Sequence, residues 1–448
     1  MPEVLFDRLT RHGRDRGSEA AVRVVGAGAT DYRTLIERIE HRAAEFSRSH
    51  AQDDPVSICR SNGLDYVIDF LAGLRAGRPV LPFHPSTTLS ERDRTMAEMR
   101  FVPAGAGLIL RSSGTTGLPK LVHRDGPSLD AVASNTATAL GLDHSDRVLA
   151  AIPLSHSYGI ENGLLAPLWA GATIEICEGF DPAVVLRQWR KGVTVVPGVP
   201  FMFEVLAGVG ERGDARSLRL AYSAGATLPR SVFEAFVQRH GLPLGQLYGA
   251  TEIGSVTFND PRRAGFDPQS VGVPMEGVSI RILHPDHASI DRPLAIGQEG
   301  HVAVRAPSML RGYIASAGEP LLDGYFLTGD LGRLDQLGAL TISGRLKLLI
   351  DIGGMKVNPL EVESVLAEHP DVHECIVVPV RVSATLVRLK ACVTARPGRR
   401  IDITLLRQFA RDRLAGYKVP RMFEVHERLP RSAMGKIQRQ HLQEPART

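Results

Sequence analysis

The alternation of short apolar runs with helical patterns constrains the fold of this chain more than any other feature. The β-rich run Ala20–Val25 is followed by a Gly-Ala-Gly turn and then by an amphipathic helical pattern that continues to Phe46. Residues Val56–Val80 repeat the arrangement with a strand, a helix over Tyr66–Gly77 and a second strand. Such alternation predicts an α/β fold, in which helices cover the faces of a layered sheet.

The turn Gly26-Ala27-Gly28 has the first two glycines of a dinucleotide-binding fingerprint. Asp31 stands at the third glycine position of that pattern, so the turn is interpreted as the tip of a hairpin. It is therefore not counted among the candidate binding sites.

The composition excludes several classes of protein. The chain has 448 residues, of which 43% are hydrophobic and 23% charged, as in ordinary globular proteins. Its net charge of +4 is too small for a nucleic-acid-binding surface, so no nucleic acid partner is expected. The segment Met1–Gly17 lacks the apolar core of a signal peptide, and no apolar run is long enough to span a membrane. The four cysteines are far apart and form no CxxC pair, which indicates a reducing compartment, so we expect a cytoplasmic protein.

A change of pattern near residue 347 predicts two domains. We expect a large N-terminal layered α/β domain over residues 1–346 and a small α+β domain over residues 347–448, with a helix over Val357–Glu368 and a strand over Cys375–Val380. Residues 348–448 contain 17 Lys and Arg against 11 Asp and Glu, a balance of +6. This positive charge is either a solvated face or an attraction for a phosphate-bearing or acidic partner.

The strongest local motif is an apolar strand, Leu108–Leu110, that runs into a loop of four hydroxyl residues, two glycines and a lysine ending at Lys120. Glycines let the backbone approach an anion and present its N–H groups, hydroxyls add hydrogen bonds and the lysine adds charge, so the loop suits phosphate. It is not a Walker loop, because Pro119 precedes the lysine and Leu121 follows it.

Two further turns place a carboxylate after an apolar strand. In Gln246–Glu252 the acid is suited to holding Mg²⁺ on phosphate oxygens, because that ion prefers hard oxygen ligands. In Tyr325–Asp330 the acid is expected at the end of a strand, where it can accept both hydroxyls of a ribose. Neither turn is specific when taken alone.

Together with Gly344–Lys347 and Leu429–Lys436, these motifs stand in the order found in the adenylate-forming superfamily of acyl- and aryl-CoA synthetases, peptide-synthetase adenylation domains and luciferases. The chain resembles this superfamily over nearly its whole length. The resemblance implies an ATP-dependent ligase that forms an acyl-adenylate and pyrophosphate from a small carboxylic acid. The acyl or aryl group then passes to a thiol, either CoA or the phosphopantetheine arm of an acidic carrier protein. A nucleotide-binding protein that activates another nucleophile is the remaining alternative.

By this resemblance, residues of both predicted domains bind ATP, and Glu252 holds the Mg²⁺. The residues implied to bind the nucleotide are Ser112, Ser113, Gly114, Thr115, Thr116, Gly117, Lys120, Ser223, Gly225, Ala226, Tyr248, Gly249, Ala250, Thr251, Asp330, Arg345 and Lys436. Within this set the hydroxyl loop embraces the β- and γ-phosphates. Tyr248 stacks on adenine, Thr251 contacts the α-phosphate, and the Asp330 and Arg345 side chains hold the ribose.

The resemblance also implies that the small domain is mobile and rotates between the two half-reactions. Lys436 reaches the substrate carboxylate and the α-phosphate during adenylation, and Lys347 occupies the hinge position. Gly353 and Gly354 follow where only a small residue leaves room for a pantetheine arm, so they form the implied thiol channel.

The segment Pro153–Gly159 resembles the part of acyl- and aryl-CoA ligases in which a histidine, here His156, closes the carboxylate end of the acyl pocket. The implied substrate-binding residues are His156, Tyr158, Gly159, Val199, Phe201, Met202, Gly225, Ala226, Gly249 and Ser255. They are mostly small or apolar, and no aspartate stands near His156 to hold an α-ammonium group, so an aromatic or medium-length acid is favoured over an α-amino acid. Glu161 is interpreted as facing solvent or a structural partner. The alternative is that it pairs with an amino or hydroxyl group of the substrate.

Overall fold

The computed structural model describes residues 1–49, 55–99, 105–112, 120–210, 216–314, 321–348, 350–352, 355–382, 387–431 and 437–443. The chain forms two compact units. The first consists of Met1–Arg281, Ala303–Thr328 and Leu334–Thr341, and the second of Ile282–Val302, Gly329–Arg333 and Ile342–Thr448. Within the described ranges, no helix combines the length and the apolar character needed to traverse a membrane.

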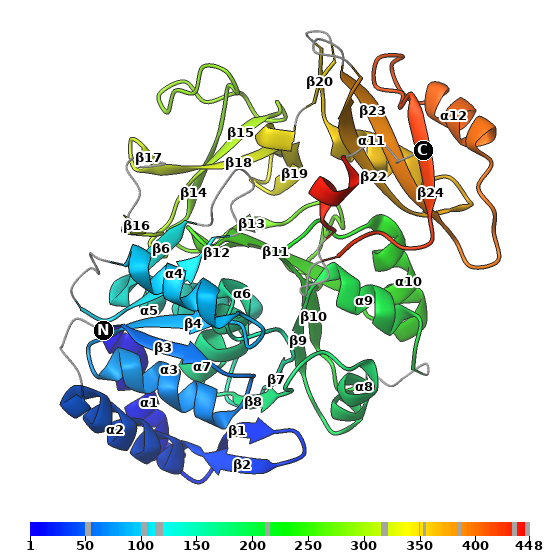
Figure 1. Cartoon of the computed structure of the whole chain (residues 1–448). Coiled ribbons are helices and arrows are strands. Elements are labelled where there is room, and N and C mark those ends of the chain that lie inside the picture. The colour runs from blue at the N-terminus through cyan, green and yellow to red at the C-terminus, as the bar shows by residue number, and fades with distance from the viewer. Residues whose placement is uncertain are drawn as a thin grey trace. The chain divides into compact units, whose positions relative to one another are not determined.

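A nine-stranded sheet is the largest element of the first unit (Figure 1). Its strands, from one edge to the other, are β13 (Val273–Pro274), β12 (Gly254–Asn259), β11 (Leu244–Ala250), β10 (Leu220–Ser223), β9 (Val195–Gly198), β7 (Arg147–Ala150), β8 (Thr173–Ile176), β1 (Ala20–Val24) and β2 (Gly28–Asp31). The run from β11 to β1 is parallel throughout, and the remaining strands are added antiparallel at the two edges. The strands of this run are nearly continuous apolar segments, as expected where helices cover both faces of a parallel sheet.

A second sheet of the same unit has five strands. In order they are β16 (Gly312–Ile314), β6 (Leu121–Asp125), β5 (Gly107–Arg111), β4 (Pro79–Phe83) and β3 (Val56–Cys59). Helix α5 (Gly126–Leu140) contacts β12 of the large sheet and also β5 and β6 of this one, so it lies between the sheets. The helices α6 (Ser157–Ile160) and α7 (Ala166–Ala170) are joined by a π-helical turn, η1 (Glu161–Leu165), that packs against α5.

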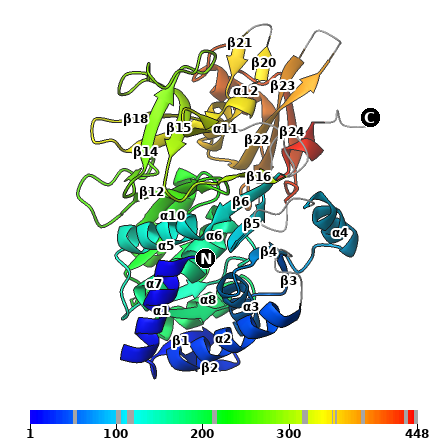
Figure 2. The same cartoon turned by 90° about the vertical axis from the view of Figure 1, so that its left-hand side faces the viewer.

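The other helices of the first unit form two groups. The N-terminal helices are α1 (Glu3–Asp15), α2 (Tyr32–Ser49), α3 (Leu64–Arg75) and α4 (Leu89–Glu98), and the later ones are α8 (Pro182–Arg190), α9 (Pro200–Ala207) and α10 (Arg230–His240). Figure 2 shows α1 beside α5 and α7, which it contacts. Local side chains set several helix ends. Asp125 caps α5 by accepting a hydrogen bond from the Ser128 amide at 3.0 Å, and Gly141 ends it in the left-handed conformation.

A third sheet has the order β14 (Ser279–Leu283), β15 (Gly300–Arg305), β18 (Tyr325–Leu334) and β17 (Leu321–Leu322), with β19 (Leu340–Arg345) also paired to β18. The strands β14, β15, β18 and β19 each contain residues of both units.

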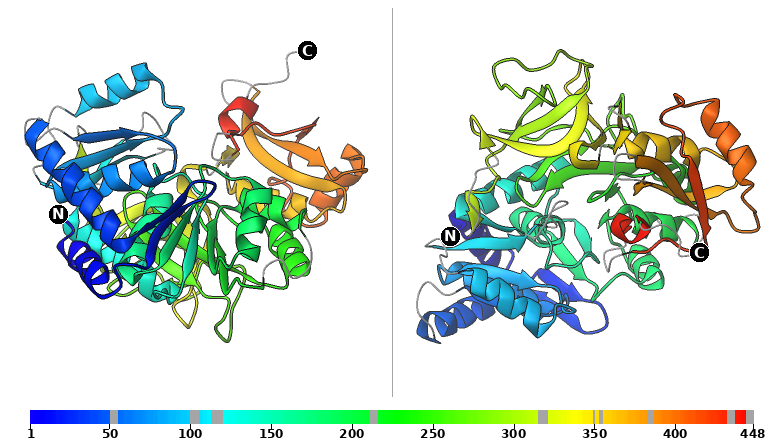
Figure 3. Two further views of the ribbon diagram at one scale, coloured as in Figure 1. Left: turned by 90° about the horizontal axis from the view of Figure 1, so that it is seen from below. Right: turned by 45° about the horizontal axis from the view of Figure 1, so that its top comes forward.

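The second unit contains a three-stranded sheet, coloured gold to red in Figure 3. Its strands are β22 (Val372–Arg381), β23 (Val387–Ala395) and β24 (Met422–His426), preceded by the hairpin β20 (Ile350–Ile352) and β21 (Met355–Val357). Helices α11 (Pro359–Ala367) and α12 (Ile403–Arg411) share one apolar core with the sheet. A separate cluster joins the other face of the sheet to Leu429 and Leu442, the latter in the 3₁₀ turn η3 (Arg439–Leu442). A further 3₁₀ turn, η2, spans Leu346–Leu348.

The predicted α/β class and the hairpin interpretation of Gly26 are confirmed, because β1 and β2 form an antiparallel pair around that turn. The predicted strand, helix and strand after residue 55 are β3, α3 and β4. The predicted helix at Val357 begins two residues later. Val357 pairs with Ile350, and Asn358 caps α11 by accepting a hydrogen bond from the Leu360 amide at 3.0 Å.

Candidate active site

Several predicted site residues of the first unit lie at or just after the ends of neighbouring strands of the large sheet. From β7 the chain passes to β8 on one side, whereas β9, β10 and β11 lie on the other side, so the strand order reverses between β7 and β9. Ligands of open α/β sheets bind outside the carboxyl ends of the strands at such a reversal. His156 follows β7, Val199 follows β9, Gly225 follows β10, and Tyr248 lies near the end of β11. The topology therefore brings four motifs that are distant in sequence to the carboxyl ends of neighbouring strands.

Side chains after β7 and β9 connect the two sides of this reversal. The Tyr158 hydroxyl donates a hydrogen bond to the carbonyl of Gly198, the last residue of β9, at 3.1 Å. On α9, Met202 is buried, whereas the neighbouring Phe201 is 38% exposed and contacts Phe180 edge-on. The predicted substrate-binding residues, here called the predicted wall of the acyl pocket, thus include both a buried residue and an exposed aromatic one.

Backbone geometry accounts for two of the predicted wall glycines. Gly225 has φ of +82°, in the left-handed region that strains any residue with a side chain. A Cβ on Gly249 would lie 2.3 Å from the carbonyl oxygen of Gly254 on the paired strand β12. Ala226 is exposed and does not have a positive φ, so its backbone conformation accepts a larger side chain.

Another group of predicted nucleotide contacts of this unit lies on or near β10 and β11. Ser223 ends β10 and is buried, and its hydroxyl has no hydrogen-bond partner among the described residues. Tyr248 precedes a bulge in β11, after which Ala250 ends the strand and Thr251 begins the turn. These residues lie at the carboxyl ends of the strands, where the reversal of strand order predicts a ligand site.

His156 lies at the N-terminus of α6, and its ring centroid is 6.3 Å from that of His84. Burial, together with the charge that His84 can carry, lowers the pKa of His156 to about 4. The imidazole is therefore neutral at pH 7. A neutral ring offers one hydrogen-bond donor and one acceptor at the predicted carboxylate end of the pocket.

The expectation that Glu161 faces solvent is wrong, and its alternative of a structural partner is confirmed. Glu161 is 1% exposed and forms an ion pair with Arg124, whose side chain is completely buried. Its Oε1 also accepts from the Ser157 hydroxyl at 2.5 Å, and its Oε2 accepts from the Ser255 amide and hydroxyl at 2.8 and 2.7 Å. Four donors therefore use this carboxylate, which leaves no free acceptor for a substrate amine.

The predicted wall residue Ser255 is part of a larger buried polar network. Asn162, which follows Glu161 in η1, donates to the Ser255 hydroxyl at 3.2 Å and accepts from the Tyr222 hydroxyl at 2.9 Å. No local motif marks Arg124, Asn162 or Tyr222, because these residues lie on three separate elements, β6, η1 and β10. The network fixes the π-helical turn against β10 and β12.

Tyr313 links two residues that the sequence assigned to ATP and Mg²⁺. The Lys120 ammonium lies 4.5 Å from the centroid of the Tyr313 ring. The Tyr313 hydroxyl donates a hydrogen bond to Oε1 of Glu252 at 3.4 Å. Burial and the nearby Glu252 carboxylate raise the pKa of the phenol, which remains a neutral donor at pH 7. Sequence reasoning missed Tyr313, because only the pairing of β16 with β6 brings it beside Lys120.

The described ends of the predicted phosphate loop are joined, since the Ser112 amide donates to the carbonyl of Lys120 at 2.8 Å. Glu252 presents a partly exposed carboxylate, a hard oxygen donor of the kind that suits Mg²⁺. Lys347 lies in η2. The predicted residues that lie outside the described ranges are Ser113, Gly114, Thr115, Thr116, Gly117, Gly353, Gly354 and Lys436.

The predicted ribose residues belong to the second unit and contact each other. Arg345 Nε lies 2.8 Å from Oδ1 of Asp330, whose side chain is 5% exposed. The expectation that Asp330 ends a strand is wrong, because β18 continues to Leu334 along its partner β19. Beside it, His301 Nε2 accepts from the Gly329 amide at 2.9 Å, and burial lowers the pKa of this histidine despite the Asp330 charge.

Comparison with protein families gives two matches. The model of the AMP-binding enzyme family matches residues 106–314, and that of the AMP-binding enzyme C-terminal domain matches residues 361–436. Malonate–CoA ligase of Arabidopsis thaliana is 32% identical over 386 residues, which cover 78% of this chain and 62% of that protein. Feruloyl-CoA synthase of an Amycolatopsis species is 32% identical over 377 residues, which cover 82% of this chain and 75% of that protein. The chain spans 62% and 60% of the length of the first two curated relatives.

Solved structures resemble the chain over almost its full length. ATP-bound MatB from Rhodopseudomonas palustris has a TM-score of 0.91 and 25% identity, with 98% of each chain covered. o-Succinylbenzoate CoA synthetase from Bacillus subtilis, in complex with an acyl-adenylate, has a TM-score of 0.84 and 24% identity, again with 98% of each chain covered, and shows a shared fold.

Proposed function

The chain belongs to the AMP-binding enzyme family, and from this premise we propose that it is an ATP-dependent ligase that joins a carboxylic acid to a thiol. The proposal rests above all on the position of four residues at the carboxyl ends of neighbouring strands of the large sheet, namely His156, Gly225, Tyr248 and Glu252. The reaction has two halves. The carboxylate attacks the α-phosphate of ATP to give an acyl-adenylate and pyrophosphate, and a thiol then displaces AMP to give a thioester.

Charge is the main obstacle in the first half-reaction, because two anions must approach each other. Lys120 and Lys436 supply compact positive charges, and Glu252 would hold an Mg²⁺ that offsets charge on the phosphate oxygens. Tyr313 acts as a positioning residue in this proposal, since it contacts both Lys120 and Glu252. No general base is needed, because the acid is already ionised at neutral pH.

The hydroxyl-rich loop is proposed to surround the β- and γ-phosphates. The loop residues assigned to this role are Ser112, Ser113, Gly114, Thr115, Thr116, Gly117 and Lys120. In the second unit the Asp330 carboxylate accepts ribose hydroxyls, and Arg345, already paired with it, orients that carboxylate. Tyr248 stacks on the adenine, and Thr251 contacts the α-phosphate.

We assign the pivot between the half-reactions to Lys347, with a large domain over residues 1–346 and a mobile domain over residues 347–448. Gly353 and Gly354 then line the path of the thiol. CoA is the favoured acceptor. The positive balance of the C-terminal region would attract its phosphates, although it would also attract an acidic carrier protein.

The proposed substrate is an acid without an α-amino group. Glu161, the acidic residue close to His156 in sequence that could have held an ammonium, is saturated by Arg124, Ser157 and Ser255. Burial of an unpaired ammonium costs several kcal/mol. The relatives named above are ligases of malonate and of ferulate, neither of which is an α-amino acid.

The four cysteines are unpaired, which supports a location in a reducing compartment such as the cytoplasm.

Pyrophosphate exchange into ATP tests the adenylation step directly. We expect exchange only when an acid and Mg²⁺ are both present, and we expect Lys436→Ala to lower it by about 10² to 10³, the effect of losing one transition-state charge partner. Exchange without acid, or hydrolysis to ADP, would rule out the proposal. A thiol-acceptor assay on a panel of aryl, alkyl and dicarboxylic acids, with CoA compared against a phosphopantetheinylated carrier protein, then identifies the acid and the acceptor.

A further inference from the structure

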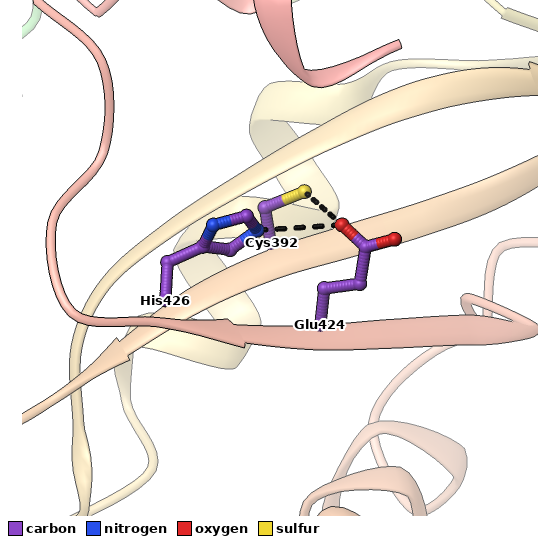
Figure 4. Close-up of side chains that lie close together, drawn as sticks. All are labelled: Cys392, Glu424 and His426. Carbon is purple, nitrogen blue, oxygen red and sulfur yellow. Dashed lines mark hydrogen bonds and ion pairs between the residues drawn. The ribbon is translucent and has the colours of Figure 1, made fainter. Parts of the chain in front are cut away.

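Three side chains that commonly ligate metals share one face of the sheet in the second unit (Figure 4). On the parallel strands β23 and β24, Cys392 stands opposite Glu424 and Thr394 stands opposite His426. Side chains two residues apart on a strand point to the same face, so Glu424 and His426 share the face of Cys392. The two strands therefore present a thiol, a carboxylate and an imidazole side by side.

This face is distinct from the one that packs against α11 and α12. Ala391 and Val393, which flank Cys392, belong to the core shared with those helices, whereas Cys392 itself packs with Leu429 and Leu442. The cluster therefore lies apart from the helical core and makes no use of the residues assigned to adenylation.

The donor atoms are spaced for a small ion. Their ligand atoms all lie within 4.8 Å of one another, with 3.9 Å from Cys392 Sγ to Glu424 Oε2 and 3.3 Å from His426 Nε2 to the same oxygen. Tetrahedral zinc with bonds of about 2.3 Å to sulfur and about 2.0–2.1 Å to nitrogen or oxygen places neighbouring ligands about 3.3–3.6 Å apart. His426 Nε2 is buried and makes no hydrogen bond within the described chain, although it lies close to the carboxylate. An ion between these atoms would satisfy the nitrogen.

Lys390 forms an ion pair with the Glu424 carboxylate. Its ammonium lies 3.0 Å from both oxygens of Glu424, and its side chain is 1% exposed. Hydrogen bonds of this kind orient ligating carboxylates. The side chains of His426 and Glu424 are 30% and 22% exposed, which gives an ion a path from solvent and lets water screen the remaining positive charge.

We propose that Cys392, Glu424 and His426 form a binding site for a thiophilic divalent cation of the zinc class, with water in the fourth position. A thiolate and an imidazole favour zinc over Mg²⁺, so this ion is separate from the one required by ATP. On binding, the Cys392 thiol releases its proton to solvent and the sulfur coordinates as a thiolate. The site is independent of the proposed ligase activity.

The test uses the full-length protein, freed of metal with a chelator and kept without nucleotide. Cobalt(II) chloride is titrated as a spectroscopic probe, because a cobalt–thiolate bond gives a near-ultraviolet charge-transfer band that Mg²⁺-type oxygen sites do not give. We expect this band in the wild type and its loss in Cys392→Ser. The matched control is Cys375→Ser, which removes a buried thiol on the helix-packed side of the sheet and should leave the band intact.

Zinc chloride binding is then measured by calorimetry. Removal of a direct ligand, as in Cys392→Ser and His426→Gln, should lower the zinc affinity by more than about 100-fold. Loss of a residue that only supports a ligand typically lowers metal affinity by about 10- to 100-fold. His426→Gln changes a partly exposed side chain and guards against misfolding of the cysteine variant, with circular dichroism as the check. Absence of the band in the wild type, its persistence in Cys392→Ser, or zinc affinity unchanged in His426→Gln would each overturn the proposal.

Discussion

Substitution of Glu161 by Gln removes one charge from the most completely buried ion pair among the described residues of the first unit, while keeping the shape of the side chain. The Arg124 and Glu161 side chains are 0% and 2% exposed. Glu161 also accepts hydrogen bonds from Ser157 and Ser255. The variant leaves the Arg124 guanidinium buried without its counter-charge.

The size of the expected loss follows from the surroundings of Arg124. Breaking a buried pair by removal of one partner costs about 3–5 kcal/mol, because the remaining charge keeps its full desolvation cost. Two guanidinium nitrogens of Arg124, Nε and Nη2, already lack hydrogen-bond partners within the described chain, so no nearby acceptor stands ready to replace the carboxylate. We therefore expect the unfolding equilibrium of this unit to rise by between roughly 100-fold and several thousand-fold.

Tryptophan fluorescence during urea denaturation measures this effect. The two tryptophans of the chain, Trp169 on α7 and Trp189 on α8, both belong to the first unit, so the signal reports that unit even if the whole chain does not unfold in a single step. The control is Glu234→Gln, which removes a carboxylate 2.7 Å from Arg230 in a pair that is 76% and 59% exposed. The control should cost less than about 1 kcal/mol.

A double variant separates charge from packing. Arg124→Met combined with Glu161→Leu replaces the pair by apolar side chains and should recover most of the loss, as apolar replacement of buried pairs often does. If Glu161→Gln costs no more than the exposed control, the argument from desolvation is refuted. If the double variant is as unstable as the single one, the hydrogen bonds to Ser255 and not the unpaired charge account for the loss.

Further predictions concern the candidate active site. Tyr313→Phe should raise the Mg²⁺ concentration needed for pyrophosphate exchange and leave KM for ATP nearly unchanged. Tyr313→Leu also removes the ring under Lys120 and should raise KM for ATP severalfold. Equal effects of the two variants would argue against separate roles for the ring and the hydroxyl. The pKa of His156 is about 4 in the fold and 6.5 in an unfolded chain, so protonation lowers the free energy of unfolding as pH falls from about 6.5 to 4. His156→Asn should make the free energy of unfolding less dependent on pH in this range. An unchanged dependence on pH would contradict the lowered pKa of His156. Ala226→Leu should shorten the acids accepted, with kcat/KM for the longest acid falling by at least about tenfold relative to the shortest, and a uniform fall would place this residue outside the pocket. Lys347→Pro fixes φ near −65° and should leave one half-reaction active in single-turnover assays while slowing the other; equal loss of both would exclude this residue as the pivot.

Local patterns predicted the parts of the fold that depend on neighbours in sequence. The hairpin at Gly26, the helix α3 and the strand β5 each follow from apolar periodicity and turn residues, and all three are present. The motif order also indicated the candidate site residues, and the reversal of strand order between β7 and β9 brings His156, Gly225 and Tyr248 to the same ends of the strands.

Long-range pairing determined what the sequence did not predict. Arg124 and Glu161 are 37 residues apart, and nothing in the local pattern around Glu161 shows that a buried guanidinium faces it. Tyr313 reaches Lys120 only because β16 is added beside β6, about 190 residues earlier in the chain. The position of Asp330 inside β18 depends likewise on the pairing of that strand with β19.

The π-helical turn η1 sets the angular phase between α6 and α7. Such a turn holds one residue more than an α-helical turn, and each α-helical residue advances about 100° around the axis. Loss of one residue from η1 would restore a continuous α-helix and swing α6 by roughly 100° relative to α7, which is anchored where Arg8 lies over the ring of Trp169. Tyr158 and Gly159 would then leave the pocket wall. A change of one residue in chain length at this turn is therefore a route by which the pocket of such a chain acquires a new lining during evolution, without substitution of any residue in that lining.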